Sequence, residues 1–312
     1  MGAPKMKSNT KVSIIIPCYN AESTIQSAIE SALNQSYKEV EVIVIDDGSS
    51  DNSLEIIKSF GDAIRWESGK NQGGCAARNR GIDLASGELI QFLDADDLLI
   101  EDKLSIQVPI IESEVADIVV CDWRSTDGNK DSVTKLSIDG PLADPFSFLL
   151  RHSLITLSPV HWRKNLLAVG GFRAELPCSQ ERDLHLRLAA NGFTFFHTPH
   201  VLVHVIRQEK SVSSNYLRVL FQHENIFENS YSILRSNGLA TYDRVKNLAK
   251  AFLIDAYNLH RVSEHSKAHV YIEKSGKILK ESNFLLLKAS YLPIKFVSTC
   301  YMLYAKIVEK PV

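Results

Sequence analysis

The sequence predicts an α/β fold: a Rossmann-like, mostly parallel twisted sheet flanked by helices and followed by a helical C-terminal extension. Two observations lead to this expectation. Short β-branched runs alternate with segments of helical periodicity through residues 12–123, and beyond residue 207 the chain is mostly helical in pattern. A β-α-β alternation is typical of a parallel sheet with right-handed crossovers, in which ligands bind beyond the carboxyl ends of the strands.

The elements of the first half follow one another in a regular order. Residues 12–16 form a β-branched run that Pro17 ends, and apolar residues then recur at helical spacing as far as Leu33, after a candidate helix N-cap at Asn20. The further strands expected are 40–45, 64–66, 88–93 and 117–123, and the further helices expected are 52–60 and 75–85. Carboxylates follow two of these strands directly, so we expect acidic groups at the ligand-binding edge of the sheet.

The second half has weaker signals. Residues 124–145 are polar and contain Asp-Gly and Asp-Pro pairs, which predict a loop-rich connection. Helical periodicity dominates after Arg207, so we place a boundary near residue 212. The last apolar segment, 283–308, has lysines on one stripe, which suits an interfacial helix at a membrane surface or a helix packed on the rest of the chain.

Composition excludes several classes of protein. The 312 residues are 45% hydrophobic and 23% charged, which excludes bulk disorder and collagen, and the net charge of −2 supplies no basic field for nucleic acid. Five scattered cysteines without a CxxC pair fit neither a disulfide framework nor a zinc site and indicate a reducing compartment. No secretory signal and no apolar run near 18 residues are present, so we expect a cytoplasmic protein.

Two common nucleotide-binding motifs are missing. No G-x-G-x-x-G follows the first strand, and Gly69-Lys70-Asn71 lacks the spacing and the hydroxyl of a P-loop. The strand ends have carboxylates instead, which repel phosphate unless a divalent cation lies between them. Asp94 and Asp96 place two hard oxygen ligands near one point, which suits Mg²⁺ or Mn²⁺ bridging a diphosphate. A lone D-x-D also occurs in acidic surface turns and at helix N-caps, so the pair alone leaves both interpretations open.

Five short motifs, in order and on the expected strand ends, resemble the nucleotide-binding half of family 2 glycosyltransferases, which are inverting enzymes of the GT-A fold. The motifs are 13–20 (SIIIPCYN), 45–51 (IDDGSSD), 77–82 (ARNRGI), 85–88 (ASGE) and 92–97 (FLDADD). The resemblance continues less tightly through 170–172 and 179–188 and ends near residue 210. It implies a GT-A domain at 11–211, made of a nucleotide-binding half at about 11–123 and an acceptor-side half at about 124–211, and a mostly helical region at 212–312.

The resemblance implies which residues contact the nucleobase. Pro17 and Tyr19 would flank it, because an aromatic face stacks on a pyrimidine. Asp47 would accept a hydrogen bond from the base, and since a carboxylate selects a ring N–H, uracil or thymine fits and cytosine does not. Its neighbour Asp46 is the alternative for this role, or it orients the turn. UDP or dTDP sugars are therefore the favoured donors.

The resemblance also implies a diphosphate and metal site. Arg78 would lie near the diphosphate, with an ordinary helix-surface position as the alternative. Asp94 would lie near the ribose or a metal-bound water, and Asp96 would be the direct ligand of Mg²⁺ or Mn²⁺.

The catalytic base falls in a segment that departs from the family pattern. The family has an acidic pair before a helix that ends in Leu-Arg-Leu, and counting back from Arg187 puts Glu181 at the base position and Gln180 where the first acid stands. Asp183 is the rival, at a second acidic position inside the helix. For both acids the alternative role is to complement the helix dipole.

The resemblance therefore implies a metal-dependent inverting glycosyltransferase that moves a sugar from a nucleotide diphosphate sugar to a glycan or lipid-linked acceptor. Bacterial surface-polysaccharide assembly is the implied process. The interfacial interpretation of segment 283–308 would add peripheral contact at the inner face of the cell membrane through the C-terminal helix. Two alternatives remain. A nucleotidyltransferase would share the α/β nucleotide site but lacks its Gly-rich loop here, and a catalytically silent nucleotide- or carbohydrate-binding module would tolerate Gln180.

Overall fold

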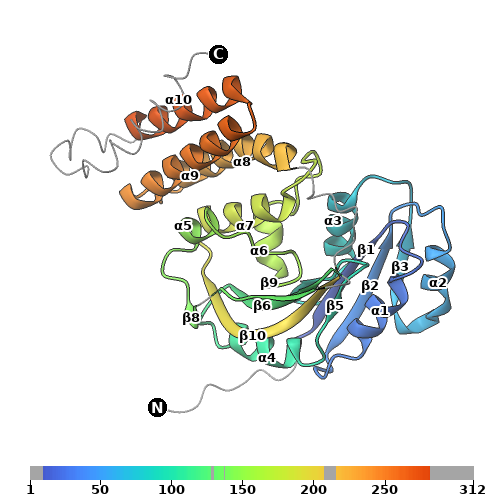
Figure 1. Cartoon of the computed structure of the whole chain (residues 1–312). Helices are drawn as coiled ribbons and strands as arrows, with labels where there is room; N and C mark the ends of the chain where they lie inside the picture. The colour runs from blue at the N-terminus through green and yellow to red at the C-terminus, as the bar shows by residue number, and fades with distance from the viewer. Residues whose placement is uncertain (1–9, 128–129, 137, 207–215, 282–312) are drawn as a thin grey trace, which may run out of the picture.

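The structure of the protein is a computed structural model that describes residues 10–127, 130–136, 138–206 and 216–281. These residues form a curved ten-stranded sheet with helices on both faces and a stack of three long helices beyond one face (Figure 1). The predicted α/β fold with a helical C-terminal extension is confirmed. The segment 283–308, which carries the predicted membrane-facing helix, lies outside the described residues.

The first half alternates strands and helices as predicted. Its elements are β1 (Val12–Cys18), α1 (Ile25–Leu33), β2 (Val40–Asp46), α2 (Ser53–Ser59), a 3₁₀ turn (Gly61–Ala63), β3 (Arg65–Ser68), α3 (Gly74–Leu84) and β4 (Leu89–Phe92). β1 lies between β2 and β4 and runs parallel to both. Because these strands point in one direction, the segments that follow Cys18, Asp46 and Phe92 meet at one edge of the sheet.

The predicted N-cap of α1 is wrong. The helix begins at Ile25, after Thr24, and Asn20 instead has a left-handed backbone with φ +49°. Asn20 Oδ1 accepts a hydrogen bond from the Ser50 N–H at 2.8 Å, and the Asn20 N–H donates to Ser49 Oγ at 3.0 Å. Asn20 therefore ties the loop after β1 to the loop after β2 and is not available to cap the helix.

The second half completes the sheet with strands of both directions. Its elements are β5 (Leu98–Leu99), α4 (Lys103–Glu112), β6 (Ile118–Thr126), β7 (Asp131–Thr134), β8 (Gly140–Pro141), α5 (Pro145–Leu149), β9 (Val160–Trp162), α6 (Arg163–Ala168), α7 (Gln180–Ala190) and β10 (Phe195–Ile206). The order across the sheet is β3-β2-β1-β4-β9-β6-β10-β5, with β7 beside β6 and β8 beside β10. β9 is antiparallel to both β4 and β6, so it joins the two parallel parts of the sheet.

The predicted loop-rich connection at 124–145 is wrong in part. β6 extends to Thr126 and forms an antiparallel hairpin with β7. Three of the four residues of β7 are exposed, so no alternation of apolar and polar residues marks this strand in the sequence.

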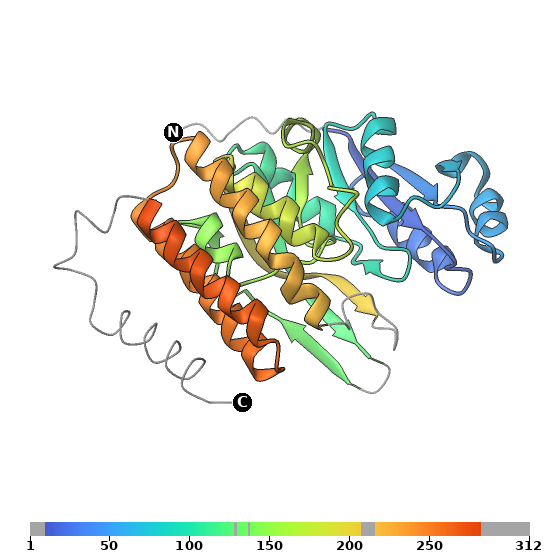
Figure 2. The same cartoon turned by 90° about the horizontal axis from the view of Figure 1, so that it is seen from above.

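The C-terminal helices form a layer of their own on α7. They are α8 (Tyr216–Ser236), α9 (Tyr242–Arg261) and α10 (His265–Glu281), and Figures 1 and 2 show them side by side beyond α7. Arg244 of α9 forms an ion pair with Asp144, which precedes α5, at 3.0 Å. Buried residues of the stack, among them Phe227 and Tyr271, belong to the same continuous hydrophobic core as the sheet. None of the helices in the described part of the chain is long and apolar enough to span a membrane.

Candidate functional site

A cavity of about 380 Å³ opens at the carboxyl edge of the sheet, where the loops after β1, β2 and β4 meet. Six residues that the sequence analysis assigned to the nucleotide and the metal line this cavity together: Pro17, Tyr19, Asp47, Arg78, Asp94 and Asp96. They come from three strand ends and from α3, and the parallel register of β1 with β2 and β4 brings them to one place. Tyr19 is 53% exposed at the cavity, although large aromatic side chains are normally buried.

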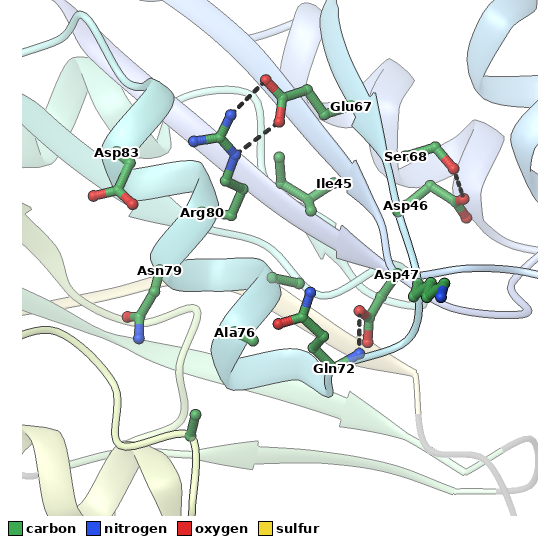
Figure 3. A pocket seen from close by; sticks show the side chains of 14 residues that line it. Ile45, Asp46, Asp47, Glu67, Ser68, Gln72, Ala76, Asn79, Arg80 and Asp83 are labelled. Carbon is green, nitrogen blue, oxygen red and sulfur yellow. Dashed lines mark hydrogen bonds and ion pairs between the residues drawn. The ribbon is translucent and has the colours of Figure 1, made fainter.

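The two aspartates after β2 are both held by neighbouring groups. Asp46 is 1% exposed, accepts a hydrogen bond from Ser68 Oγ at 2.6 Å and accepts another from the Ser49 N–H at 3.2 Å. Asp47 accepts the N–H of Gln72 and the N–H of Gly73, one on each carboxylate oxygen, at 2.8 Å (Figure 3). Both carboxylates therefore hold loops at the end of β2, but only Asp47 also lines the cavity after β1.

A glycine allows these loops to approach each other. Gly48 has φ +77°, and a Cβ at this position would lie 2.9 Å from Asn71 N and from Gly69 O. A side chain here would collide with backbone atoms that cannot move away, so the close contact between the turn after β2 and the loop before α3 requires glycine.

The side chain of Arg78, on α3, reaches the segment that follows β4. Its Nη2 donates to Asp94 Oδ1 at 2.5 Å, and its guanidinium lies 5.4 Å from the centre of the Phe172 ring. Burial alone would lower the pKa of Arg78, but the Asp94 carboxylate and its hydrogen bond raise it above the usual range. Arg78 is therefore a permanently charged, oriented cation at the floor of the cavity.

The carboxylates after β4 are crowded. Burial, and then the charge of Asp94, raise the pKa of Asp96. The same two causes raise the pKa of Asp97 to about 8, although Asp97 Oδ1 accepts the Ile206 N–H at 2.8 Å. Arg78 pairs with Asp94, whereas Asp96 forms no ion pair with a described residue. This edge of the sheet therefore has more carboxylates than cations to neutralise them.

The donor set fits a hard divalent cation. Asp96 is partly exposed at the cavity, and a cation there would relieve the repulsion from Asp94 that raises its pKa. Within the part of the chain that the structure describes, no group of three or more His, Cys, Asp or Glu side chains is arranged as a metal site. A cation at Asp96 would therefore need further oxygen ligands, which water or a diphosphate can supply.

The two candidate bases on α7 have different surroundings. Glu181 is partly buried in the first turn of the helix, and burial raises its pKa. The charge of Arg78 lowers this pKa, and the charge of Asp94 raises it. Asp183 is fully buried and paired with Arg187 at 2.7 Å and with Arg173 at 3.5 Å. The structure thus brings Glu181 beside the charges of the cavity and places Asp183 in an internal ion-pair cluster.

The backbone is strained on both sides of the cavity. Ser179, which precedes α7, has φ +56°, and Asn20 at the cavity has φ +49°. Left-handed conformations cost energy for residues with a Cβ and are found preferentially at functional sites. Neither residue was singled out as unusual by the sequence, because a left-handed conformation of a serine or an asparagine leaves no pattern in its neighbours.

A second cavity of about 430 Å³ lies on the other side of Asp47, between the end of β3 and α3 (Figure 3). Arg80 and Glu67 cross it as a bidentate ion pair with distances of 2.7 and 2.9 Å. Asn79 borders this cavity (Figure 3), and its side-chain amide is hydrogen bonded to the backbone of Phe172. The sequence analysis did not identify Asn79, although it lies next to Arg78, because its partner Phe172 is 93 residues away.

The fold and the cavity together define an α/β protein with a mostly parallel sheet and an acidic edge. The family model for "Glycosyl transferase family 2" matches residues 13–167. The chain is 30% identical to the Escherichia coli protein described as UDP-Glc:alpha-D-GlcNAc-diphosphoundecaprenol beta-1,3-glucosyltransferase WfaP, over 75% of this chain and 89% of that protein. The chain therefore belongs to glycosyltransferase family 2, as the resemblance predicted.

Other relatives match over shorter stretches. An uncharacterized glycosyltransferase of Haemophilus influenzae is 48% identical over 31% of this chain, and the chain spans 40% of that relative's length. One from Rickettsia felis is 46% identical over 35% of this chain, and the chain spans 19% of its length.

Solved structures share the fold at low sequence identity. Residues 1–349 of Staphylococcus aureus TarS, in complex with UDP-GlcNAc, align with a TM-score of 0.61 at 18% identity and cover 90% of this chain and 93% of that one. The mannosyltransferase PcManGT of Pyrobaculum calidifontis, in complex with GDP-Man and Mn²⁺, aligns with a TM-score of 0.57 at 16% identity, over 97% of this chain and 88% of that one. These likenesses establish the GT-A fold for this chain.

Proposed function

We propose that the chain transfers a sugar from a UDP or dTDP sugar to an acceptor hydroxyl with inversion at the anomeric carbon, in the assembly of a surface polysaccharide. One observation carries the proposal. The cavity at the sheet edge holds Asp47, Arg78 and Asp96, and the charges of Arg78 and Asp94 also act on Glu181 of α7. Candidate groups for the nucleobase, the diphosphate, a cation and the acceptor proton therefore belong to one region of the molecule.

The nucleobase would lie between Pro17, Tyr19 and Asp47. The exposed Tyr19 ring offers a stacking face. Each Asp47 oxygen already accepts one backbone N–H, but an ionised carboxylate has about four acceptor sites, so about two remain, and a ring N–H of uracil or thymine can use one of them. Cytosine has no such N–H, and it would leave that acceptor unpaired.

The diphosphate would face Arg78, Asp94 and Asp96. Asp96 would hold Mg²⁺ or Mn²⁺, with Asp94 nearby, and the bound cation would offset the negative charge on the leaving diphosphate. Arg78 is oriented by Asp94 and by the Phe172 ring, so it can donate to a phosphate oxygen without first losing conformational freedom.

Glu181 would be the general base. Burial raises its pKa, which makes the carboxylate a stronger proton acceptor than an exposed one. The acceptor oxygen attacks the anomeric carbon, its proton passes to Glu181, and the bond from that carbon to the diphosphate breaks. Attack from the face opposite the leaving group inverts the anomeric centre.

We further propose a sugar on a lipid-linked diphosphate as the acceptor. The support is the E. coli relative, whose description names such an acceptor and which matches over most of both chains. The protein would then work in the cytoplasm, at the inner face of the cell membrane that contains its acceptor.

The test is a thermal-shift panel of UDP, dTDP, CDP and GDP sugars, each with and without Mn²⁺, followed by a transfer assay with the donor that stabilises most. A ligand at about a hundred times its Kd adds about 2.7 kcal/mol to the free energy of unfolding. We expect UDP or dTDP sugars to stabilise most and to be hydrolysed slowly to free nucleoside diphosphate. Preferred CDP binding would contradict the role of Asp47, and binding without any hydrolysis or transfer would indicate the silent binding module.

A further inference from the structure

The turn formed by residues 169–172 connects the two parts of the site. It follows α6 and lies between α7, which contains Glu181, and α3, which contains Arg78. Gly170 and Gly171 both have left-handed backbones, with φ +78° and +65°, so the chain reverses direction tightly here.

α7 holds one side of the 169–172 turn through Arg187. Its Nη1 donates to the Val169 carbonyl and its Nη2 to the Gly171 carbonyl, each at 2.7 Å. Its Nε donates to Asp183 Oδ2, also at 2.7 Å, so the carboxylate fixes the plane of the guanidinium. Arg187 thereby attaches the turn to the helix whose first turn contains Glu181.

α3 holds the other side through Asn79. Asn79 Oδ1 accepts the Phe172 N–H at 2.8 Å, and Asn79 Nδ2 donates to the Phe172 carbonyl at 2.7 Å. A Cβ at Gly171 would lie 2.5 Å from Asn79 Oδ1, so the amide is packed directly against the turn. Both hydrogen bonds go to the backbone of one residue, which fixes its orientation as well as its position.

Phe172, which Asn79 holds in this way, also contacts Arg78, the cation proposed to face the diphosphate. The Phe172 ring lies under the Arg78 guanidinium and packs edge-on against Phe92 of β4, with ring centres 5.1 Å apart. A continuous set of contacts therefore runs from Glu181 through α7, Arg187 and the turn to Asn79, Phe172 and Arg78.

We propose that Asn79 is a positioning residue, which sets the placement of Glu181 relative to the Arg78–Asp94 pair through the 169–172 turn. This inference rests on the proposed function of the same site. Asn79 lies on α3 next to Arg78, and its two hydrogen bonds fix the backbone of a distant loop. Its loss would let the turn and α7 move from the donor site, so the base and the anomeric carbon would no longer be in line.

The expected kinetic effect is on turnover more than on donor binding. A displacement of about 1 Å of a catalytic group can cost about 10²-fold in rate. The side-chain hydrogen bonds of Asn79 go to Phe172 and not to the loops of Asp47 and Tyr19, so we expect the Asn79→Ala variant to lose about 10²-fold in kcat and to keep the donor KM within about threefold.

A second readout reports the surroundings of the base directly. Burial is the main cause that raises the pKa of Glu181, so a loosened turn that admits water should lower this pKa. The acid limb of the kcat–pH profile of Asn79→Ala should then move to lower pH. A ¹³C NMR titration of the carboxyl groups, with Glu181→Gln to identify the resonance, measures the same shift without any turnover.

The experiment measures hydrolysis of the donor by water, with the nucleotide sugar that stabilises the wild-type chain most. It compares wild type, Asn79→Ala and the control variant Arg80→Ala. Arg80 is the next residue on α3, and its bonds go to Glu67, so the control removes a side chain from the same helix without touching the turn. We expect Arg80→Ala to keep kcat within twofold and the acid limb unchanged.

The outcomes separate the two proposals. If wild type hydrolyses no nucleotide sugar, the proposed function fails, and the titration still tests the placement of Glu181. If wild type is active and a folded Asn79→Ala keeps its kcat within twofold, Asn79 is not a positioning residue. The same conclusion holds if the variant changes only by a higher donor KM. Should Asn79→Ala not fold, Asn79→Asp is judged by the same criteria, because it keeps the volume and the acceptor for the Phe172 N–H and loses only the donor.

Discussion

Asp183 and Arg187 form an ion pair four residues apart on α7, with 2.7 Å between Oδ2 and Nε, and both side chains are at most 5% exposed. Arg173 approaches the other oxygen of Asp183 at 3.5 Å. Asp183 therefore has an arginine at each oxygen and no exposed surface through which a substrate could reach it. Glu181, two residues earlier, forms no ion pair with a described residue, and the charges of Arg78 and Asp94 act on it.

Replacing Asp183 by Asn should destabilise the fold. The change leaves the Arg187 guanidinium buried without a counter-charge, which costs on the order of 3 to 5 kcal/mol for a buried pair. Urea unfolding, followed by circular dichroism, measures the loss. Glu175→Gln is the matched control, because Glu175 pairs with Arg173 at the surface, where an ion pair is worth about 0 to 1 kcal/mol. Equal free energies of unfolding for the two variants would show that the buried pair contributes no more to stability than the surface pair.

Replacing Glu181 by Gln should lower turnover by about 10²- to 10⁴-fold, because a general base contributes about that much. Donor affinity should change little, since the base acts on the acceptor and not on the nucleotide. Steady-state kinetics with the selected donor measure kcat, and a nucleotide titration measures Kd. Near-normal turnover of Glu181→Gln beside an inactive but folded Asp183→Asn would assign the base to Asp183 instead.

Turnover should be lost on acidification at a higher pH than an exposed glutamate as the base would give. Glu181 acts as a base only when deprotonated, and burial raises its pKa above the usual value of about 4.3. As pH falls through this raised pKa, the carboxylate is protonated and kcat is lost, whereas turnover is fully present above it. A kcat profile between about pH 4 and pH 8 locates the limb. A limb at or below pH 4 would mean that Glu181 is exposed during turnover or that another group is the base.

Replacing Asp96 by Asn should remove the dependence of nucleotide binding on Mn²⁺. Asp94 and Asp96 repel a bare diphosphate, so wild type should bind nucleotide more tightly with the cation than without it. Isothermal titration with and without Mn²⁺ measures the difference, and turnover should be lost with it. Asp102→Asn, an exposed residue before α4, is the control and should behave as wild type. Binding to Asp96→Asn that still strengthens with Mn²⁺ would remove Asp96 from the metal site.

Much of the first half of the fold follows from local patterns. β1 and β2 are mostly buried runs rich in β-branched residues, of the length that fits a buried parallel strand. β4 is a short buried run, whereas β3 is mostly exposed and was expected only as a short strand. The parallel order then fixes which ends meet, so the gathering of Asp47, Asp94 and Asp96 at one edge could be predicted before the structure. β7 and β9 could not be predicted, because an exposed or very short strand has no periodic signal and exists through its neighbours.

The sequence by itself determined which functional groups this protein has, and the spacing of its motifs determined the edge of the sheet to which they belong. Only the tertiary structure shows that Glu181 and Asp183 differ in partners, since among the described residues two arginines pair with Asp183 and no ion pair forms at Glu181. It alone joined Asn79 to Phe172 across 93 residues. Contacts of this kind depend on how the helices pack on the sheet, and packing depends on the whole chain at once.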